Sequence, residues 1–354
     1  MKLNVKLDKI DEELMYKRTI IKTGDKEIIT PVKAGFKKSP LIGINEMYKQ
    51  FSLEKLDRCN NDEAYERNTN REVKYQQSGE TNFLIVDYSD IELPRRKHIE
   101  TLSDIQYENS DVVITPTCSK ITRELAEDSL LNSFKNITNE YIEIVRTMNN
   151  KTIIGVIPSR MPRQYLDNII NNYHDKDITS FVIDFDGRSI DTNPSWIRKL
   201  MKSLNNYDLI KEGFIYSLNS NEGKFLRNAT EIVAKDFIAT GFGIDIIGLN
   251  HIPPRLSSEA WIKIKQERRE NTFRIFNRNS YGYIKKTESE LQRMSIMNRD
   301  QLKNYNINEQ YKESKTLQEK IKENDTIESY IKSKSQMSDE VIKKIKNLRK
   351  QTFS

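Results

Sequence analysis

The chain has 354 residues, with 58 Lys or Arg and 52 Asp or Glu, so its formal net charge is +6. It contains no run of about 18 apolar residues, which excludes a membrane-spanning helix of the usual kind, and residues 1–8 lack the apolar core of a signal peptide. Two cysteines exclude a disulfide scaffold and a four-cysteine zinc site, and three histidines leave little for a His-rich site. We therefore expect a cytoplasmic protein without metal or cofactor.

The first part of the chain predicts a mixture of short strands and polar segments. Residues 1–20 are charged, with a weak helical pattern. Two β-prone runs between residues 19 and 29 flank Thr23-Gly24-Asp25, a sequence typical of a turn. Residues 50–80 are strongly polar and indicate a solvated loop or an irregular insertion.

From Asn82 onward, apolar runs alternate with helix-like segments. Strands are expected near residues 83–86, 111–115, 152–157, 181–185, 213–216 and 244–247. Helices are expected between them, at 119–149, 163–173, 194–204 and 229–240. Continuous apolar strands separated by helices predict a parallel sheet buried on both faces. With the early hairpin region, the strands are enough for an α/β fold of the (β/α)₈ TIM-barrel type. A doubly wound open sheet is the alternative, which the absence of a G-x-G-x-x-G motif disfavours.

The predicted barrel covers residues 1–285, including the polar insertion, and residues 286–354 form a charged helical extension. Within the extension, Ser338 is expected to cap a helix, with an apolar stripe that contains Val341, Ile342, Ile345 and Leu348. The simplest interpretation is a solvated helix that packs one thin face. A nucleic-acid-binding tail is the alternative, although the interleaved acidic residues weigh against it.

Polar side chains follow the predicted strands at their carboxyl ends, where barrels of this type carry function. They include Asp87, Asp90, Cys118, Arg160, Asp184, Asp186, Arg188, Asn219, Asn250, His251 and Arg255. A carboxylate there can attack an anomeric carbon, move a proton or accept hydrogen bonds from a purine. The structural alternative for each aspartate is a helix cap, and Asp186-Gly187 has the composition of a turn. For His251 the alternative is a packing role.

Six segments between residues 19 and 255 share an ordered pattern at these strand ends. They are Lys22–Pro31, Leu84–Ser89, Ser110–Cys118, Ile154–Pro158, Phe185–Gly187 and Gly243–Ile247. In this order they resemble the opening hairpin, the Asp-Ser-Gly-Gly, Phe-Asp-Glu-Cys, Gly-Ile-Val-Gln and Phe-Asp-Gly segments, and the nucleophile-bearing strand of the tRNA-guanine transglycosylase family. The resemblance implies a (β/α)₈ barrel that exchanges guanine for a 7-deazaguanine base in tRNA, or in DNA for related phage and bacterial enzymes.

The family mechanism, as the resemblance implies it, uses three aspartates. One attacks the ribose anomeric carbon, a second handles protons and a third recognises the base. Asp87 matches the Asp-Ser-Gly-Gly aspartate, while Thr117 stands at the base-recognising Asp, Pro158 at the recognising Gln and Gly248 at the expected nucleophile. The family's three-cysteine, one-histidine zinc cluster is missing, because the chain has only Cys59 and Cys118.

Together, the residues and the resemblance predict a base-exchange enzyme that uses no cofactor. The expected catalytic residues are Asp87, Asp184, Asp186 and His251, and the expected substrate-binding residues are Asp90, Thr117, Pro158, Arg160, Asn219 and Asn250. The expected partners are tRNA or DNA and a purine or 7-deazapurine base, with a homo-oligomer or a catalytic partner subunit as further options and no membrane. One alternative is a catalytically degenerate transglycosylase paralogue that serves as a nucleic-acid-binding or partner subunit. Another is an unrelated barrel enzyme that acts on a small molecule through Asp184 and His251.

Overall fold

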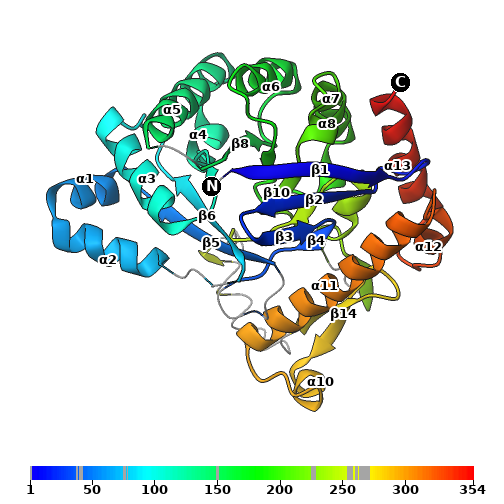
Figure 1. The fold of residues 1–354 in the computed structure, drawn as a ribbon. Helices are drawn as coiled ribbons and strands as arrows, with labels where there is room; N and C mark the ends of the chain where they lie inside the picture. The colour runs from blue at the N-terminus through cyan, green and yellow to red at the C-terminus, as the bar shows by residue number, and fades with distance from the viewer. Residues whose placement is uncertain are drawn as a thin grey trace.

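A computed structural model describes residues 2–36, 39, 43–74, 77, 79–148, 151–224, 229–252, 258–259, 262 and 272–354 of the chain. The fold is mixed α/β, with a six-stranded parallel sheet in the order β4-β12-β10-β9-β8-β7 and helices packed around it (Figure 1). Its strands are β4 (Val32–Lys33), β7 (Val113–Ile114), β8 (Ile153–Pro158), β9 (Phe181–Asp184), β10 (Ile215–Leu218) and β12 (Ile246–Ile247).

Three smaller sheets accompany the six-stranded sheet. β5 (Ile44–Phe51) and β6 (Thr81–Tyr88) form a parallel pair. An antiparallel sheet contains β1 (Leu3–Ile10), β2 (Lys17–Thr23) and β3 (Lys26–Ile29), and another contains β11 (Glu231–Val233), β14 (Gly282–Thr287) and β13 (Thr272–Asn277). Two isolated parallel bridges pair Gly35 with Asn45 and Asp87 with Thr117.

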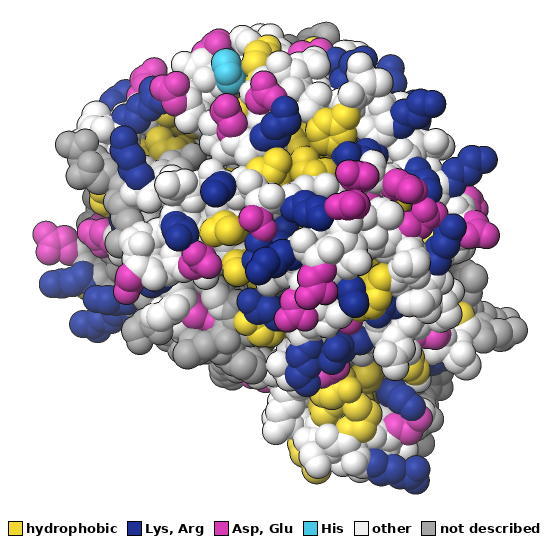
Figure 2. Space-filling model, turned by 45° about the vertical axis from the view of Figure 1, so that its right-hand side comes forward, with side chains coloured by type: hydrophobic (Ala, Val, Ile, Leu, Met, Phe, Trp, Pro, Cys, Tyr) yellow, Lys and Arg dark blue, Asp and Glu magenta, His cyan; other side chains and the backbone are white. Residues whose placement is uncertain are grey.

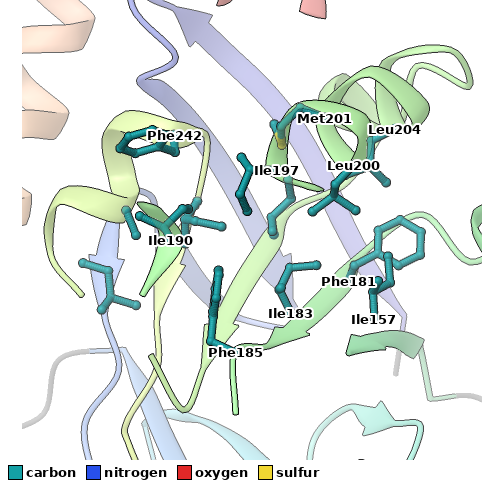
Figure 3. Close-up of a cluster of buried hydrophobic side chains, with 14 of the residues drawn as sticks. Ile157, Phe181, Ile183, Phe185, Ile190, Ile197, Leu200, Met201, Leu204 and Phe242 are labelled. Carbon is teal, nitrogen blue, oxygen red and sulfur yellow. The ribbon is translucent and has the colours of Figure 1, made fainter. Parts of the chain in front are cut away.

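Two apolar clusters lie on opposite faces of the parallel strands, because side chains alternate along a strand. The strand cluster contains Ile21, Ile28, Val32, Ala34, Ile44, Phe83, Ile85, Val112, Ile114, Ile154, Val156, Val182, Phe214, Tyr216, Leu218 and Ile246. Phe181 and Ile183, which flank Val182 in β9, point to the other face. There they meet Ile197, Leu200 and Met201 of α7 (Pro194–Asn205), as Figure 3 shows.

The remaining helices complete the outer layer and the C-terminal segment. They are α1 (Leu53–Asn61), α2 (Glu63–Val73), α3 (Arg96–Asn109), α4 (Ser119–Glu124), α5 (Glu127–Thr147), α6 (Leu166–His174), α8 (Leu209–Glu212), α10 (Glu288–Arg293), α11 (Arg299–Glu323), α12 (Glu328–Lys332) and α13 (Asp339–Thr352). Within the described ranges, none of the helices combines the length and the apolar character needed to cross a membrane.

The apolar runs after Asn82 form strands β6 to β10 and β12, and the turn at Thr23-Gly24-Asp25 joins β2 to β3, so these predictions are confirmed. Three predictions are wrong. Residues 1–20 contain β1 and the start of β2 rather than a helical pattern. The polar stretch 50–80 forms α1 and α2, because each helix needs to bury only a narrow stripe, such as Leu56 and Cys59 of α1. The helix expected at 229–240 is replaced by β11 and the short 3₁₀ helix Ile238–Phe242.

The C-terminal helices pack tightly against the rest of the molecule. Ser338 caps α13 as predicted, and Ile342, Ile345 and Leu348 are buried. The Gln318 amide of α11 donates hydrogen bonds of 2.7 and 2.9 Å to the carbonyl oxygens of Ile29 and Pro31. Many charges on these helices are paired, and Figure 2 shows basic and acidic side chains interspersed on the face that carries α12 and α13. This mixture favours the packed helical interpretation of residues 286–354 over a uniformly basic surface.

A buried ion pair fixes the amino end of β12. Asp245 is fully buried, and its Oδ2 lies 2.8 Å from the ammonium of Lys17, which is 2% exposed. The hydroxyls of Thr19 and Thr30 each donate to Oδ1 at 3.1 Å, and the backbone N–H of Ile215 donates to Oδ2 at 2.7 Å. These bonds join β2 and the residues after β3 to the six-stranded sheet.

Candidate active site

Asp87, near the carboxyl end of β6, is a fully buried carboxylate that accepts five hydrogen bonds. Its Oδ1 accepts from the Thr117 hydroxyl at 2.9 Å and from the Ser119 backbone N–H at 3.1 Å. Its Oδ2 accepts from the hydroxyls of Ser119 and Tyr48 and from the Gln50 amide, at 2.8, 3.1 and 2.9 Å. Both oxygens of Asp87 therefore already accept hydrogen bonds, which hold its side chain in one orientation.

Three polar residues of β5 face this same region, and the sequence analysis did not identify them. Glu46, Tyr48 and Gln50 alternate along the strand, so their side chains share one face. The in-register pairing of β5 with β6 sets Gln50 opposite Asp87. The sequence pattern that indicates such a strand is the placement of polar residues at alternate positions 46, 48 and 50. This pattern leads directly into the polar stretch 50–80, which was interpreted as a loop or insertion.

Glu46 holds His251 in a fixed orientation. The Glu46 side chain is completely buried, and its Oε1 contacts Nε2 of His251. The Tyr216 hydroxyl and the Leu249 backbone N–H also donate to this carboxylate. The Tyr48 ring stacks on the imidazole with a centroid distance of 4.4 Å and an interplanar angle of 5°. Nδ1 of His251 has no hydrogen-bond partner among the described residues, and the side chain is 18% exposed, so it is available for proton transfer.

Asp184, the last residue of β9, is a second group suited to proton transfer. Its Oδ1 accepts hydrogen bonds of 3.0 Å from the Asn219 amide and from the backbone N–H of Asp186. Oδ2 has no hydrogen-bond partner among the described residues. Burial, reinforced by the charges of Asp87 and Asp186, raises the pKa of Asp184 to about 7, although the two hydrogen bonds act in the opposite direction. The carboxyl group therefore gains and loses a proton near neutral pH.

Asp186, only two residues later, has the opposite electrostatic environment. Its φ of +48° and the positive φ of Gly187 form a turn, which agrees with the structural alternative suggested by the sequence. Arg123 of α4 and Arg160 both form ion pairs with its carboxylate. Burial alone would raise the pKa of Asp186, but the hydrogen bonds and charges of these two arginines hold it below its ordinary value. Asp186 therefore stays ionised, and its carboxylate neutralises the positive charge of Arg160.

Asn219 links these groups across the strand ends. Its Nδ2 donates to Asp184, and its Oδ1 accepts a 3.0 Å hydrogen bond from the backbone N–H of His251. A positive φ of 55° turns the chain at this residue after β10. The structure thus joins the following predicted residues through their contacts: Asp87 with Thr117, Asp184 with Asn219, Asn219 with His251, and Asp186 with Arg160.

The other predicted site residues have local structural contacts. Asp90 accepts a 2.7 Å hydrogen bond from the backbone N–H of Leu53, at the start of α1. Pro158 ends β8 and is buried opposite Asp184, and its side chain offers no polar atom. Asn250 is exposed, and its side chain accepts from the backbone N–H of Ile252. Arg255 lies outside the described residues.

Gly248, which stands at the family's nucleophile position in the resemblance, has no room for a side chain. A β-carbon there would collide with the carbonyl oxygen of Ser217 and the ring of Tyr216, and would lie 2.8 Å from Oε2 of Glu46. The Glu46 carboxylate, contributed by another strand, lies where a side chain from residue 248 would point. A carboxylate is therefore present at this place, although residue 248 itself is a glycine.

No cluster of three or more His, Cys, Asp or Glu side chains in the described part of the chain is arranged to hold a metal ion. No model of a known protein family matches the chain, and no curated protein matches it either. Function is therefore inferred from the residues at the strand ends and from the resemblance of the strand segments.

Proposed function

We propose that the chain is a (β/α)₈-barrel enzyme that exchanges a purine base for a 7-deazaguanine-type base at an N-glycosidic bond of tRNA or DNA. The barrel is supported by the two isolated bridges, which connect the edge strands β4 and β7 of the six-stranded sheet to the β5–β6 pair. It is also supported by the strand cluster, to which β4, β5, β6, β7, β8, β9, β10 and β12 each contribute a residue. These pairings favour a closed ring of parallel strands, whose carboxyl ends would carry the active site.

The observation that carries the proposed activity is the presence of two proton-transfer groups on either side of Asn219. Asp184 titrates near neutral pH, and His251 is oriented by Glu46, with no partner for Nδ1 among the described residues. In the proposed reaction, the bond between C1′ and the departing base breaks while Asp184 gives its proton to the leaving nitrogen. The incoming base gives a proton from its ring nitrogen to His251 and forms the new bond to C1′. The two enzyme groups then return to their starting protonation through solvent.

Asp87 acts in this proposal as a positioning residue. Its Oδ2 accepts the hydroxyl proton of Tyr48, and the Tyr48 ring stacks on His251. Burial and the charge of Asp87 raise the pKa of Tyr48 far above its ordinary value, so the phenol stays protonated and continues to donate. The stack and the Glu46 hydrogen bond together limit rotation of the imidazole, which is the preorganisation that proton transfer requires.

The test is incorporation of radiolabelled guanine or 7-deazaguanine into tRNA and into duplex DNA by the full chain. We expect Asp184→Asn and His251→Gln to lower the incorporation rate by about 10²–10⁴-fold, the usual contribution of a positioned acid or base. Asp175→Asn is the matched control, because Asp175 is an exposed aspartate at the end of α6. Absence of incorporation into every nucleic acid, or equal rates for all variants, would overturn the proposal.

A second candidate function is a degenerate transglycosylase-like subunit that binds nucleic acid or a catalytic partner. The lack of room for a side chain at Gly248 favours it, because residue 248 cannot supply the nucleophile that the resemblance implies. This candidate predicts salt-dependent binding of labelled tRNA or DNA, unchanged by Asp184→Asn, without base incorporation. Incorporation that depends on Asp184 would rule it out.

A further inference from the structure

A cleft of about 790 Å³ opens beside the strand ends and is separate from the Glu46–His251 pair, neither of which lines it. Its walls come from the ends of β4 and β12, from the residues after β10, from β13 and β14, and from α10 and α11. The volume lies in the range of small-molecule sites. Asn250, one of the expected substrate-binding residues, lines the cleft, but the two proposed proton-transfer groups, Asp184 and His251, do not.

One wall of the cleft presents two cations that form no ion pair with a described residue. Arg299 and Lys303 lie one turn apart on α11, and neither forms an ion pair with a carboxylate among the described residues. The Lys303 ammonium lies 4.2 Å from the ring centroid of Phe36 instead. Burial lowers the pKa of Lys303, so an anion bound beside it would favour its charged form. Two further cations on the lining are paired: Arg274 lies 3.3 Å from Glu222, and Lys33 lies 4.0 Å from Asp236.

Other lining residues present buried acceptors that lack a partner. Asp236 and Ser220 are each 4% exposed, and Oδ1 of Asp236 and Oγ of Ser220 have no hydrogen-bond partner among the described residues. The other oxygen of Asp236 accepts from the Tyr283 hydroxyl at 2.9 Å and from the Gln310 amide at 3.0 Å. Buried polar atoms in folded proteins almost always have a partner, so the Asp236 oxygen leaves a place for a ligand donor and the Ser220 hydroxyl a place for a ligand donor or acceptor.

Apolar side chains line the same cleft together with these polar groups: Phe273, Leu291, Ile296, Met297, Leu302 and Ile307. A ligand that matches all three features has an anionic group, N–H donors and a flat apolar body. A sugar phosphate lacks the apolar body, and a free nucleoside leaves the cations unneutralised. Phosphate groups are well matched to arginine and lysine side chains.

We propose that this cleft binds a nucleoside phosphate, with its phosphate at Arg299 and Lys303 and the N–H groups of its base at Asp236 and Ser220. The same chemistry is offered by a free mononucleotide and by one unit of a nucleic-acid strand. The inference does not depend on base exchange, because it requires binding only.

The test is titration calorimetry of the full chain with guanosine monophosphate, guanosine, ribose 5-phosphate and a five-residue single-stranded oligonucleotide. We expect guanosine monophosphate to bind at least about tenfold more tightly than guanosine or ribose 5-phosphate, and Arg299→Gln and Lys303→Gln each to weaken it at least about tenfold. Lys312→Gln is the matched control, because Lys312 lies on α11 outside the cleft, is exposed and pairs with Glu309. Arg299 is also exposed, so its substitution leaves the packing of α11 intact.

Tighter binding of the oligonucleotide than of the mononucleotide would identify a strand as the natural ligand, and the reverse order would identify a free nucleotide. Equal binding by all variants, ribose 5-phosphate that binds as tightly as the nucleotide, or no binding of either nucleotide form would overturn the inference. Nucleotide binding without any base incorporation would support it while removing the proposed function.

Discussion

The raised pKa of Asp184 predicts that this residue lowers the stability of the fold at neutral pH while it supports the proposed proton transfer. Folding raises its pKa from 3.8 to about 7, so the folded chain binds this proton more tightly than the unfolded chain. The free energy of unfolding therefore falls as the pH rises from about 4 to about 7, and the loss stays constant above that. At about 1.36 kcal/mol per pH unit, the cost at pH 8 is about 4 kcal/mol.

The Asp184→Asn variant should remove this cost. An asparagine oxygen still accepts from Asn219 and from the backbone N–H of Asp186, while the new NH₂ group, without an acceptor, costs about 1–3 kcal/mol. We expect the variant to be about 1–3 kcal/mol more stable at pH 8 in urea unfolding, and about 1–3 kcal/mol less stable near pH 4, where the carboxyl group is protonated and the ionisation cost is absent. Base exchange should fall in the same variant.

Asp186→Asn supplies a control of opposite sign. The two arginines lower the pKa of Asp186, so its stabilisation is present above the ordinary carboxyl pKa and is lost as the pH falls. This variant should therefore be less stable than the unmodified chain at pH 8. If Asp184→Asn instead loses stability at pH 8, the assignment of Asp184 as a buried carboxyl group with a raised pKa is wrong.

Three further variants test other contacts. Gly248→Ala should lower stability by about 1–3 kcal/mol, because its β-carbon would come closer than 3.0 Å to backbone and side-chain atoms; an unchanged melting temperature would contradict this close approach. Lys17→Met should cost about 3–5 kcal/mol in urea unfolding, because it leaves the Asp245 carboxylate buried without its cation, and a loss below about 1 kcal/mol would contradict that. Glu46→Gln should lower the base-exchange rate about 100-fold or more by releasing His251, whereas an unchanged rate would show that the pair plays no part in turnover.

The parallel strands after Asn82 were predicted because they are buried on both faces, where most residues are apolar. β5 was missed because one of its faces carries Glu46, Tyr48 and Gln50, whose hydrogen-bond partners come from other strands. The short helices α1 and α2 were missed because their stability depends on a few buried residues and on caps at Ser52 and Asp62 rather than on a long apolar stripe. Periodicity alone does not report such tertiary support.

For the site, residue types at strand ends were predictable, but the choice of partners was not. Asp184 and Asp186 are indistinguishable by composition, yet one carboxyl group lies buried against Asn219 and the other lies between two arginines. Arg123, one of those arginines, lies on α4, far from Asp186 in the sequence. Opposite pKa shifts two residues apart therefore follow from the packing of distant elements, which a single sequence does not encode in any local pattern.

The pairing of β4 with β12 has a consequence for how the protein is made. Val32 pairs with Ile246, and α11 later hydrogen-bonds to Ile29 and Pro31. A ribosome releases β4 early, but β12 and α11 emerge only after most of the chain has been synthesised. Until then, the edge of β4 and its apolar residues remain uncovered, and such long-range pairings form slowly. Translation speed and chaperone supply should therefore influence the yield of native protein more than they would for a chain built from local contacts.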